Sequence, residues 1–149
     1  MSRIRRHVIP FVTAAAVIIA LPVTAHAIPA SNMFVTPSGN IWCLVPNGEG
    51  TDPAGGVVCE IREHSYTAPP KPADCHLDWG DRISLKPGAA PQVHCHGDTI
   101  FVPGMPTLSY GQSRSAGPIT CEVQPSGVTC TDSDSGHFFT LSRQSLELN

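Results

Sequence analysis

Short alternating runs of apolar and polar residues dominate the pattern of this sequence. The segments 39–45 and 117–123 share one such run, glycine-x-isoleucine-x-cysteine-x-valine. Residues two apart lie on the same face of a β-strand, so each run predicts a strand with its cysteine on an apolar face. No segment sustains the period of an amphipathic helix. The pattern therefore predicts an all-β protein.

Turn residues separate the short strands throughout the chain. After an irregular lead over residues 28–40, the alternation predicts strands at 41–45, 56–62, 82–86, 92–96, 107–112, 118–123, 127–131 and 138–142. The prolines within 66–72 cannot donate to a β-ladder and favour a polyproline II strap. This spacing is typical of a small antiparallel β-sandwich or barrel built from hairpins.

The first 27 residues have the three parts of a secretory signal peptide. Three arginines precede the apolar run 8–23, and Ala-His-Ala at 25–27 supplies a cleavage site. The run contains two prolines and is shorter than the roughly 20 residues of a membrane-spanning helix. The arginine pair at 5–6 lacks the flanking residues of a twin-arginine signal, so Sec export is expected. We expect a signal peptide at 1–27 and a single secreted all-β domain at 28–149.

Removal of the signal peptide changes the charge of the protein. The whole chain has a formal net charge of −3, and loss of the three N-terminal arginines leaves 6 basic against 12 acidic residues, a net charge of −6. The remaining basic residues are scattered singly, whereas a nucleic-acid surface clusters them on one face. No nucleic-acid partner and no membrane span after cleavage are therefore expected.

The cysteines predict a covalent framework. All 6 follow residue 27, and an even number in an exported chain of this size indicates three disulfides. Each of these two cysteine-containing strands is followed by a second shared sequence, glycine-valine-x-cysteine, so each repeat looks like a hairpin with two facing cysteines. Coincidence is the alternative explanation of this repeat. The expected pairs are Cys43–Cys59, Cys121–Cys130 and, for the remaining two cysteines, Cys75–Cys95.

The most suggestive polar cluster is His94-Cys95-His96, followed by Asp98. Imidazoles bind zinc or copper, and His76 would come near if Cys75 pairs with Cys95. The metal-binding spacings with two cysteines or two histidines a few residues apart are absent, and bridged cysteines are not thiolate ligands. We therefore expect no metal and no cofactor. His94, His96 and Asp98 are the candidate binding residues.

Two further signals of chemistry are weaker. The segment 132–137 resembles the start of a calcium loop, but its glycine falls at the fifth position and Arg143 occupies the twelfth, so a solvated turn is expected. For hydrolysis, the chain lacks a nucleophile-elbow motif and a free cysteine. His137 or His96 would be the base if the protein were a hydrolase.

Four segments together resemble a known family. They are Phe34 to Cys43, Cys95 to Thr99, Tyr110-Gly111 and Gly136 to Arg143. In these segments the chain is similar to small secreted, cysteine-containing proteins of unknown function from actinobacteria, mycobacteria included. The resemblance implies an exported, cysteine-bridged domain without an assigned activity, so it supplies no catalytic or binding residues.

Export, bridged hairpins and the lack of a catalytic motif favour one functional class. We expect a non-enzymatic binding domain whose partner is an unidentified protein or envelope ligand outside the cytoplasm. A small extracytoplasmic hydrolase, a histidine-based metal-binding protein and a purely structural envelope component are the alternatives.

Overall fold

The computed structural model of the protein describes residues 33–46 and 56–149. The predicted signal peptide at 1–27 lies outside this range, as do residues 47–55. In the described part the chain forms ten β-strands and no helix. The prediction of an all-β protein is confirmed. No helix in this part is long and apolar enough to cross a membrane.

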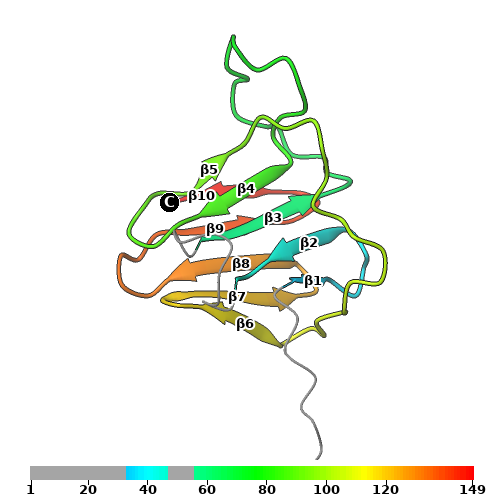
Figure 1. Ribbon diagram of the computed structural model, residues 1–149, viewed down its shortest axis with the longest axis vertical. Helices are drawn as coiled ribbons and strands as arrows, with labels where there is room; N and C mark the ends of the chain where they lie inside the picture. The colour runs from blue at the N-terminus through cyan, green and yellow to red at the C-terminus, as the bar shows by residue number, and fades with distance from the viewer. Residues whose placement is uncertain (1–32, 47–55) are drawn as a thin grey trace, which may run out of the picture.

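The strands form two five-stranded antiparallel sheets, and each sheet is a meander in chain order. The first sheet contains β1 (Met33–Val35), β2 (Ile41–Leu44), β3 (Val57–Ile61), β4 (Arg82–Leu85) and β5 (Gln92–Val93). The second contains β6 (Ser113–Ala116), β7 (Ile119–Gln124), β8 (Gly127–Asp132), β9 (Phe138–Leu141) and β10 (Leu146–Leu148). Both sheets run from top to bottom of Figure 1 in the corresponding order, from β5 and β10 to β1 and β6. The fold is a β-sandwich whose two layers share one topology.

Two predicted strands need correction. The segment 107–112 is not a strand, because only Thr107 forms a single bridge, and the strand β6 begins later at Ser113. The segment 92–96 pairs with β4 only at its first two residues. It leaves the sheet because His96 pairs with Asp78 instead.

The sequence predicts an irregular lead over residues 28–40, and this is wrong for residues 33–35, while residues 28–32 lie outside the described part. Residues Met33–Val35 form β1 and pair with β2. At the other end of the chain, Leu146–Leu148 forms β10 on the edge beside β9. Both are three-residue edge strands, so their sequences are too short to show an alternation. Pairing with a longer neighbour defines them.

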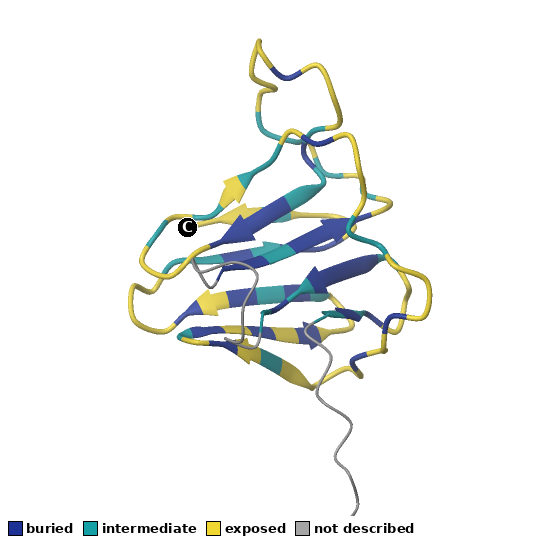
Figure 2. Cartoon of the chain, viewed as in Figure 1, coloured by how far each residue is buried: buried dark blue, intermediate teal, exposed yellow. Residues whose placement is uncertain are grey.

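The core lies between the two sheets, and their outer faces differ. In the second sheet, β7 alternates strictly between buried and exposed residues, as expected for a sheet with one face in solvent. In the first sheet, β2 and β4 have three consecutive buried residues and β3 also buries three in a row. Figure 2 shows this difference as nearly continuous dark blue on these three strands. The outer face of the first sheet is therefore partly covered.

Two disulfides lie at the centre of the core. Cys43 faces Cys59 across β2 and β3, and Cys121 faces Cys130 across β7 and β8, with Cα–Cα distances of 4.1 and 3.9 Å. All four cysteines are fully buried, and the sulfurs of Cys59 and Cys130 lie 3.9 Å apart across the two sheets. Each sheet thus contributes one disulfide-bridged hairpin at the equivalent position, as the repeated sequence pattern predicts.

The third disulfide, Cys75–Cys95, also confirms the predicted pairing and lies outside the core cluster. Three disulfides indicate an oxidising environment outside the cytoplasm.

A buried carboxylate ties the two sheets together at one end. Asp132, the last residue of β8, accepts hydrogen bonds from the Gly88 amide of the β4–β5 turn and the Ser135 hydroxyl, both at 2.7 Å, and from the Asp134 amide at 3.0 Å. The hydrogen bond from Gly88, followed by that from Ser135, lowers the pKa of Asp132 to about 2. The turn predicted over 132–137 is confirmed. Hydrogen-bond donors of the protein satisfy the Asp132 carboxylate, which would be the first ligand of a calcium loop.

We expect reduction of the disulfides to unfold the protein. The bridges span 16, 20 and 9 residues, and for such loops the chain-entropy model gives about 3 kcal/mol each. Three bridges contribute up to roughly 9 kcal/mol, which is comparable to the net stability of a domain. Circular dichroism and thermal melting in excess reductant measure the effect. An unchanged spectrum and melting temperature would contradict the prediction.

A pair of double variants separates the core bridges from the outer one. Replacing Cys75 and Cys95 with alanine removes only the outer constraint and should leave a folded protein with a lower melting temperature. Replacing Cys121 and Cys130 also removes buried sulfur atoms from the core, so its melting temperature should be lower still.

Candidate functional site

The outer face of the first sheet carries an unusual mixture of apolar and charged side chains. Its residues alternate with the core residues along β2, β3 and β4, and therefore point away from the second sheet. Glu60 pairs with Arg82 on the neighbouring strand, and Leu44 pairs with Val58. The outward residues of these strands are Trp42, Leu44, Val58, Glu60, Arg82 and Ser84.

The connecting segment, residues 94–107, carries the chain from β5 along this face to β1. It hydrogen-bonds to Glu60 of β3, and its Phe101 ring packs on Trp42 of β2 with ring centroids 4.8 Å apart. At its end, Thr107 bridges to Val35 of β1. Figure 1 shows it in yellow-green, running down the side of the sheet. The connecting segment is the cover that buries the outer face.

A buried ion pair anchors the connecting segment to the sheet. Arg82 donates two hydrogen bonds to the Glu60 carboxylate, at 3.0 and 2.7 Å. It also donates to the carboxylate and the carbonyl oxygen of Asp98, at 2.9 and 2.7 Å. The side chains of Arg82 and Glu60 are only 11% and 7% exposed. One guanidinium therefore joins β3, β4 and the connecting segment.

Glu60 is the acceptor at the centre of this network. It accepts hydrogen bonds from the Thr99 hydroxyl at 2.6 Å and the Ile100 amide at 3.2 Å, besides those from Arg82. Burial by itself raises the pKa of Glu60, but the hydrogen bonds from Thr99, Arg82 and Ile100 outweigh it and lower the pKa below the ordinary value. Glu60 is thus held as a carboxylate. It fixes the backbone of the connecting segment over the sheet.

The two histidines of the predicted site have different surroundings. His96 is buried, with one ring nitrogen 3.0 Å from the Asp81 carboxylate and the other 2.7 Å from the Asp98 carbonyl oxygen. His94 places its Nε2 2.5 Å from the hydroxyl of Ser84. His96 therefore holds the connecting segment in place, whereas His94 lies against the outer face.

His94 is uncharged at neutral pH. Burial, followed by the nearby positive charges of Arg82, Lys86 and His96, lowers the pKa of His94 below its usual value. A neutral imidazole offers one donor and one acceptor nitrogen. It can therefore serve as a polar wall or as a base.

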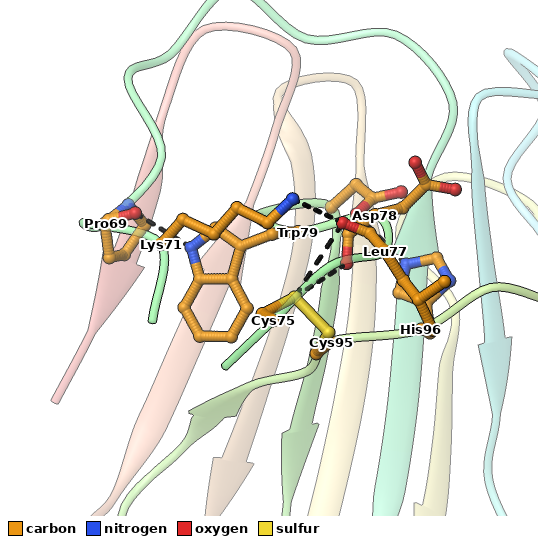
Figure 3. The surroundings of a disulfide bond; sticks show 9 residues. Pro69, Lys71, Cys75, Leu77, Asp78, Trp79, Cys95 and His96 are labelled. Carbon is orange, nitrogen blue, oxygen red and sulfur yellow. Dashed lines mark hydrogen bonds and ion pairs between the residues drawn. A yellow bond between two sulfur atoms is a disulfide. The ribbon is translucent and has the colours of Figure 1, made fainter. Parts of the chain in front are cut away.

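A disulfide-bound lobe fixes the position of these histidines. Figure 3 shows the bond between Cys75, in the lobe over residues 66–79, and Cys95, which lies between His94 and His96. The indole of Trp79 closes the lobe by donating to the Pro69 carbonyl oxygen at 2.8 Å. The prolines predicted to form a strap over 66–72 belong to this lobe. The bridge attaches the lobe to the start of the connecting segment.

A pocket opens between the connecting segment and the outer face, and we call it the face pocket. Its volume is about 260 Å³. Cavities of roughly 150 Å³ with apolar walls hold a benzene molecule, so the face pocket has room for one apolar side chain or small ring. Its walls are Leu44, Val58, Arg82, His94, Cys95 and Ile100.

The structure places His94 and Asp98 against Arg82, whereas His96 contacts Asp81 and the Asp98 carbonyl oxygen. Only His94 lines the face pocket, while Asp98 is exposed at the end of the ion network. That these three residues bind a ligand stays a prediction. The sequence pattern did not single out Glu60 and Arg82. Their signal was the presence of charged residues at outward positions of the predicted strands 56–62 and 82–86.

The described residues contain one group of three or more potential metal ligands that lie close enough to share an ion. It consists of Cys59, Cys121 and Cys130. Their sulfurs form disulfides and are not thiolates, so they do not offer a metal site. His94 and His96 are not in this group, because they face Ser84 and Asp81.

The ion pair on the outer face should contribute far more to stability than one at the surface. We expect Arg82→Leu to cost roughly 3–5 kcal/mol, because Glu60 is left buried without its cation. The double variant Glu60→Gln with Arg82→Leu should recover part of that loss. Urea unfolding measures both free energies.

Arg143→Ala is the matched control for this prediction. It breaks the pair with Glu63, in which both side chains are more than half exposed, and should cost at most about 1 kcal/mol. Equal losses for Arg82→Leu and Arg143→Ala would contradict the burial argument.

Comparison with known proteins places the chain in a family. Residues 13–148 match the model of a family of unknown function, DUF6636, and this range includes every described strand. No curated protein and no solved structure matches the chain. The chain therefore belongs to DUF6636, a family of unknown function.

Proposed function

We propose that the protein is an exported binding domain whose face pocket takes an uncharged apolar group from a partner outside the cytoplasm. The observation that carries this proposal is the pocket of about 260 Å³ between the connecting segment and the first sheet. Ligand sites are concave and mostly apolar, with a few polar groups that orient the ligand. Leu44, Val58 and Ile100 supply the apolar walls, and Arg82 and His94 the polar ones.

The charges around the face pocket favour an uncharged ligand. Arg82 is paired with two carboxylates, Glu60 and Asp98, so its positive charge is already balanced. His94 is neutral because its pKa is lowered. An anion would therefore meet the carboxylates of Glu60 and Asp98 beside Arg82, and a cation would meet the buried guanidinium. A neutral ligand avoids both penalties.

The pocket is built in advance of binding. Its floor consists of paired strands, and its cover is held by Arg82, by the Thr99 hydrogen bond to Glu60 and by the Cys75–Cys95 bridge. A preorganised site loses little conformational entropy when a ligand binds. This rigidity supports a binding role.

Export is supported by three features of the chain. The first 27 residues have the pattern of a signal peptide, the cysteines form three disulfides, and four segments resemble secreted actinobacterial proteins. We propose Sec export, cleavage after Ala27 and action in the medium or the cell envelope.

The binding proposal is tested with three small aromatic probes of different charge. Benzyl alcohol should shift the NMR methyl signals of Leu44, Val58 and Ile100 at millimolar concentration, while benzoate and benzylammonium should bind more weakly. Val58→Trp should fill the pocket and abolish the shifts. Binding should also weaken once the pH drops below the lowered pKa of His94, because the protonated ring adds a charge.

Thr129→Trp is the matched control. Thr129 precedes Cys130 on β8 as Val58 precedes Cys59 on β3, and it has no part in the face pocket. Thr129→Trp should bind benzyl alcohol like the unsubstituted protein. The absence of methyl shifts, or shifts that survive in Val58→Trp, would overturn the binding role and favour a purely structural one.

A second candidate function, hydrolysis, is favoured by one contact. The Ser84 hydroxyl lies 2.5 Å from His94 Nε2, so a hydroxyl and an imidazole are in direct contact, as a nucleophile and its base must be. The sequence favours His137 or His96 as the base, but both ring nitrogens of His96 contact Asp81 and Asp98, and Nδ1 of His137 contacts the Asn149 backbone oxygen. His94 would take their place. Binding is the better supported function because Ser84 is buried.

A serine-reactive fluorophosphonate probe distinguishes the two candidates. We expect no stoichiometric labelling, because the buried Ser84 hydroxyl does not line the face pocket. Mass spectrometry measures the modification, with Ser84→Ala as the specific variant and Ser115→Ala, an exposed serine of β6, as the control. Labelling of one serine that is lost only in Ser84→Ala would overturn the binding role in favour of hydrolysis.

A further inference from the structure

A second pocket lies at one end of the sandwich, away from the face pocket, and we call it the end pocket. Turns from both sheets meet there: the β1–β2 turn, the β7–β8 turn and the β9–β10 turn, which share the right-hand end of Figure 1. Tyr110, between the connecting segment and β6, completes the wall. The volume is about 200 Å³. Segments more than 100 residues apart in the sequence thus form one hollow.

Internal hydrogen bonds hold the frame of the end pocket. The side-chain amide of Asn40 donates to the Glu63 carbonyl oxygen at 2.9 Å and accepts from the Glu63 amide at 3.0 Å. The Thr36 hydroxyl lies 3.0 Å from that of Ser38 and accepts from the Ile41 amide at 3.2 Å. The β1–β2 turn is therefore fixed before any ligand arrives.

Other polar groups of the end pocket remain available. Within the described residues, the Tyr110 hydroxyl, the Ser126 hydroxyl and the Gln144 amide form no hydrogen bond with the protein, and all three residues are exposed. Tyr110 is 43% exposed, which is high for a large apolar ring. A rigid frame thus presents donors, acceptors and one aromatic face to the same hollow.

The charge of the end pocket is balanced. Arg143 is its cationic wall residue, and its guanidinium donates to the Glu63 carboxylate at 2.7 Å. Gln124 and Gln144 add uncharged amides, which both donate and accept hydrogen bonds. An anion would compete with Glu63 for Arg143, so the lining favours a neutral ligand rich in hydroxyl groups.

We propose that the end pocket binds one residue of an uncharged saccharide. A sugar ring has hydroxyl groups at its edge for Gln144, Ser126 and Tyr110, and a face of C–H groups that packs on an aromatic ring. The hollow of about 200 Å³ has room for one such ring. The site is independent of the face pocket and of the apolar ligand proposed for it.

Saturation-transfer NMR tests this proposal on the whole oxidised domain. The probes are the methyl glycosides of glucose, galactose, mannose, arabinose and N-acetylglucosamine, with glucuronate and glucosamine as charged analogues. At least one neutral glycoside should receive saturation and shift the ring signals of Tyr110 and the side-chain amide of Gln144. Tyr110→Ala and Gln144→Ala should each weaken its binding by roughly tenfold.

Three controls keep the outcome specific to the end pocket. Gln92→Ala on β5 and Val102→Ala in the connecting segment remove exposed side chains outside the end pocket and should leave saccharide binding unchanged. Val58→Trp fills only the face pocket, so it separates this proposal from the binding of apolar groups. Circular dichroism confirms that each variant is folded.

Three results would overturn the proposal. The first is no saturation transfer to any of the neutral glycosides. The second is transfer that persists in both Tyr110→Ala and Gln144→Ala, which would place the sugar elsewhere. The third is tighter binding of glucuronate than of the neutral glycosides, which would make Arg143 an anion site.

Discussion

Contact between two disulfides at the centre of the sandwich is the constraint on which the rest of the fold depends. Cys59 and Cys130 touch across the core, and each is bonded to the facing strand of its own sheet. Each bridge joins directly opposed residues of its hairpin, and the sulfur contact aligns the two hairpins across the core. A chain with short strands and many prolines and glycines can form an ordered core because its centre is covalently defined.

The two sheets share a topology, but their outer faces differ in how far they are covered. The functional site is expected on the covered face. The connecting segment covers the outer face of the first sheet, so residues such as Glu60 and Arg82 are buried there as an ion pair. The second sheet keeps a solvated outer face, as the exposed alternate residues of β7 show. Covering one face of a sheet with an irregular segment leaves hollows that regular packing would fill. The face pocket is one of these hollows.

The sequence predicts a small β-sandwich or barrel, most strands and the two hairpin disulfides, because a period of two and a repeated cysteine pattern are local signals. The third disulfide follows from the two cysteines that remain. It does not reveal β6, whose Ser-Arg-Ser-Ala sequence has no apolar alternation, or the three-residue edge strands β1 and β10. The candidate site is harder still. His94, His96 and Asp98 are adjacent in the chain, but Glu60 reaches them through Arg82, and such contacts arise only when distant strands pair.

Each of the three disulfides joins two cysteines of the same half of the molecule. Two lie before residue 96 and one after residue 120, so no covalent bond other than the backbone joins the two sheets. Each sheet can therefore be oxidised as a separate unit. The buried apolar faces and the contact between the sulfurs of Cys59 and Cys130 hold the two halves together. Formation of the bridges in one half thus requires no cysteine from the other half.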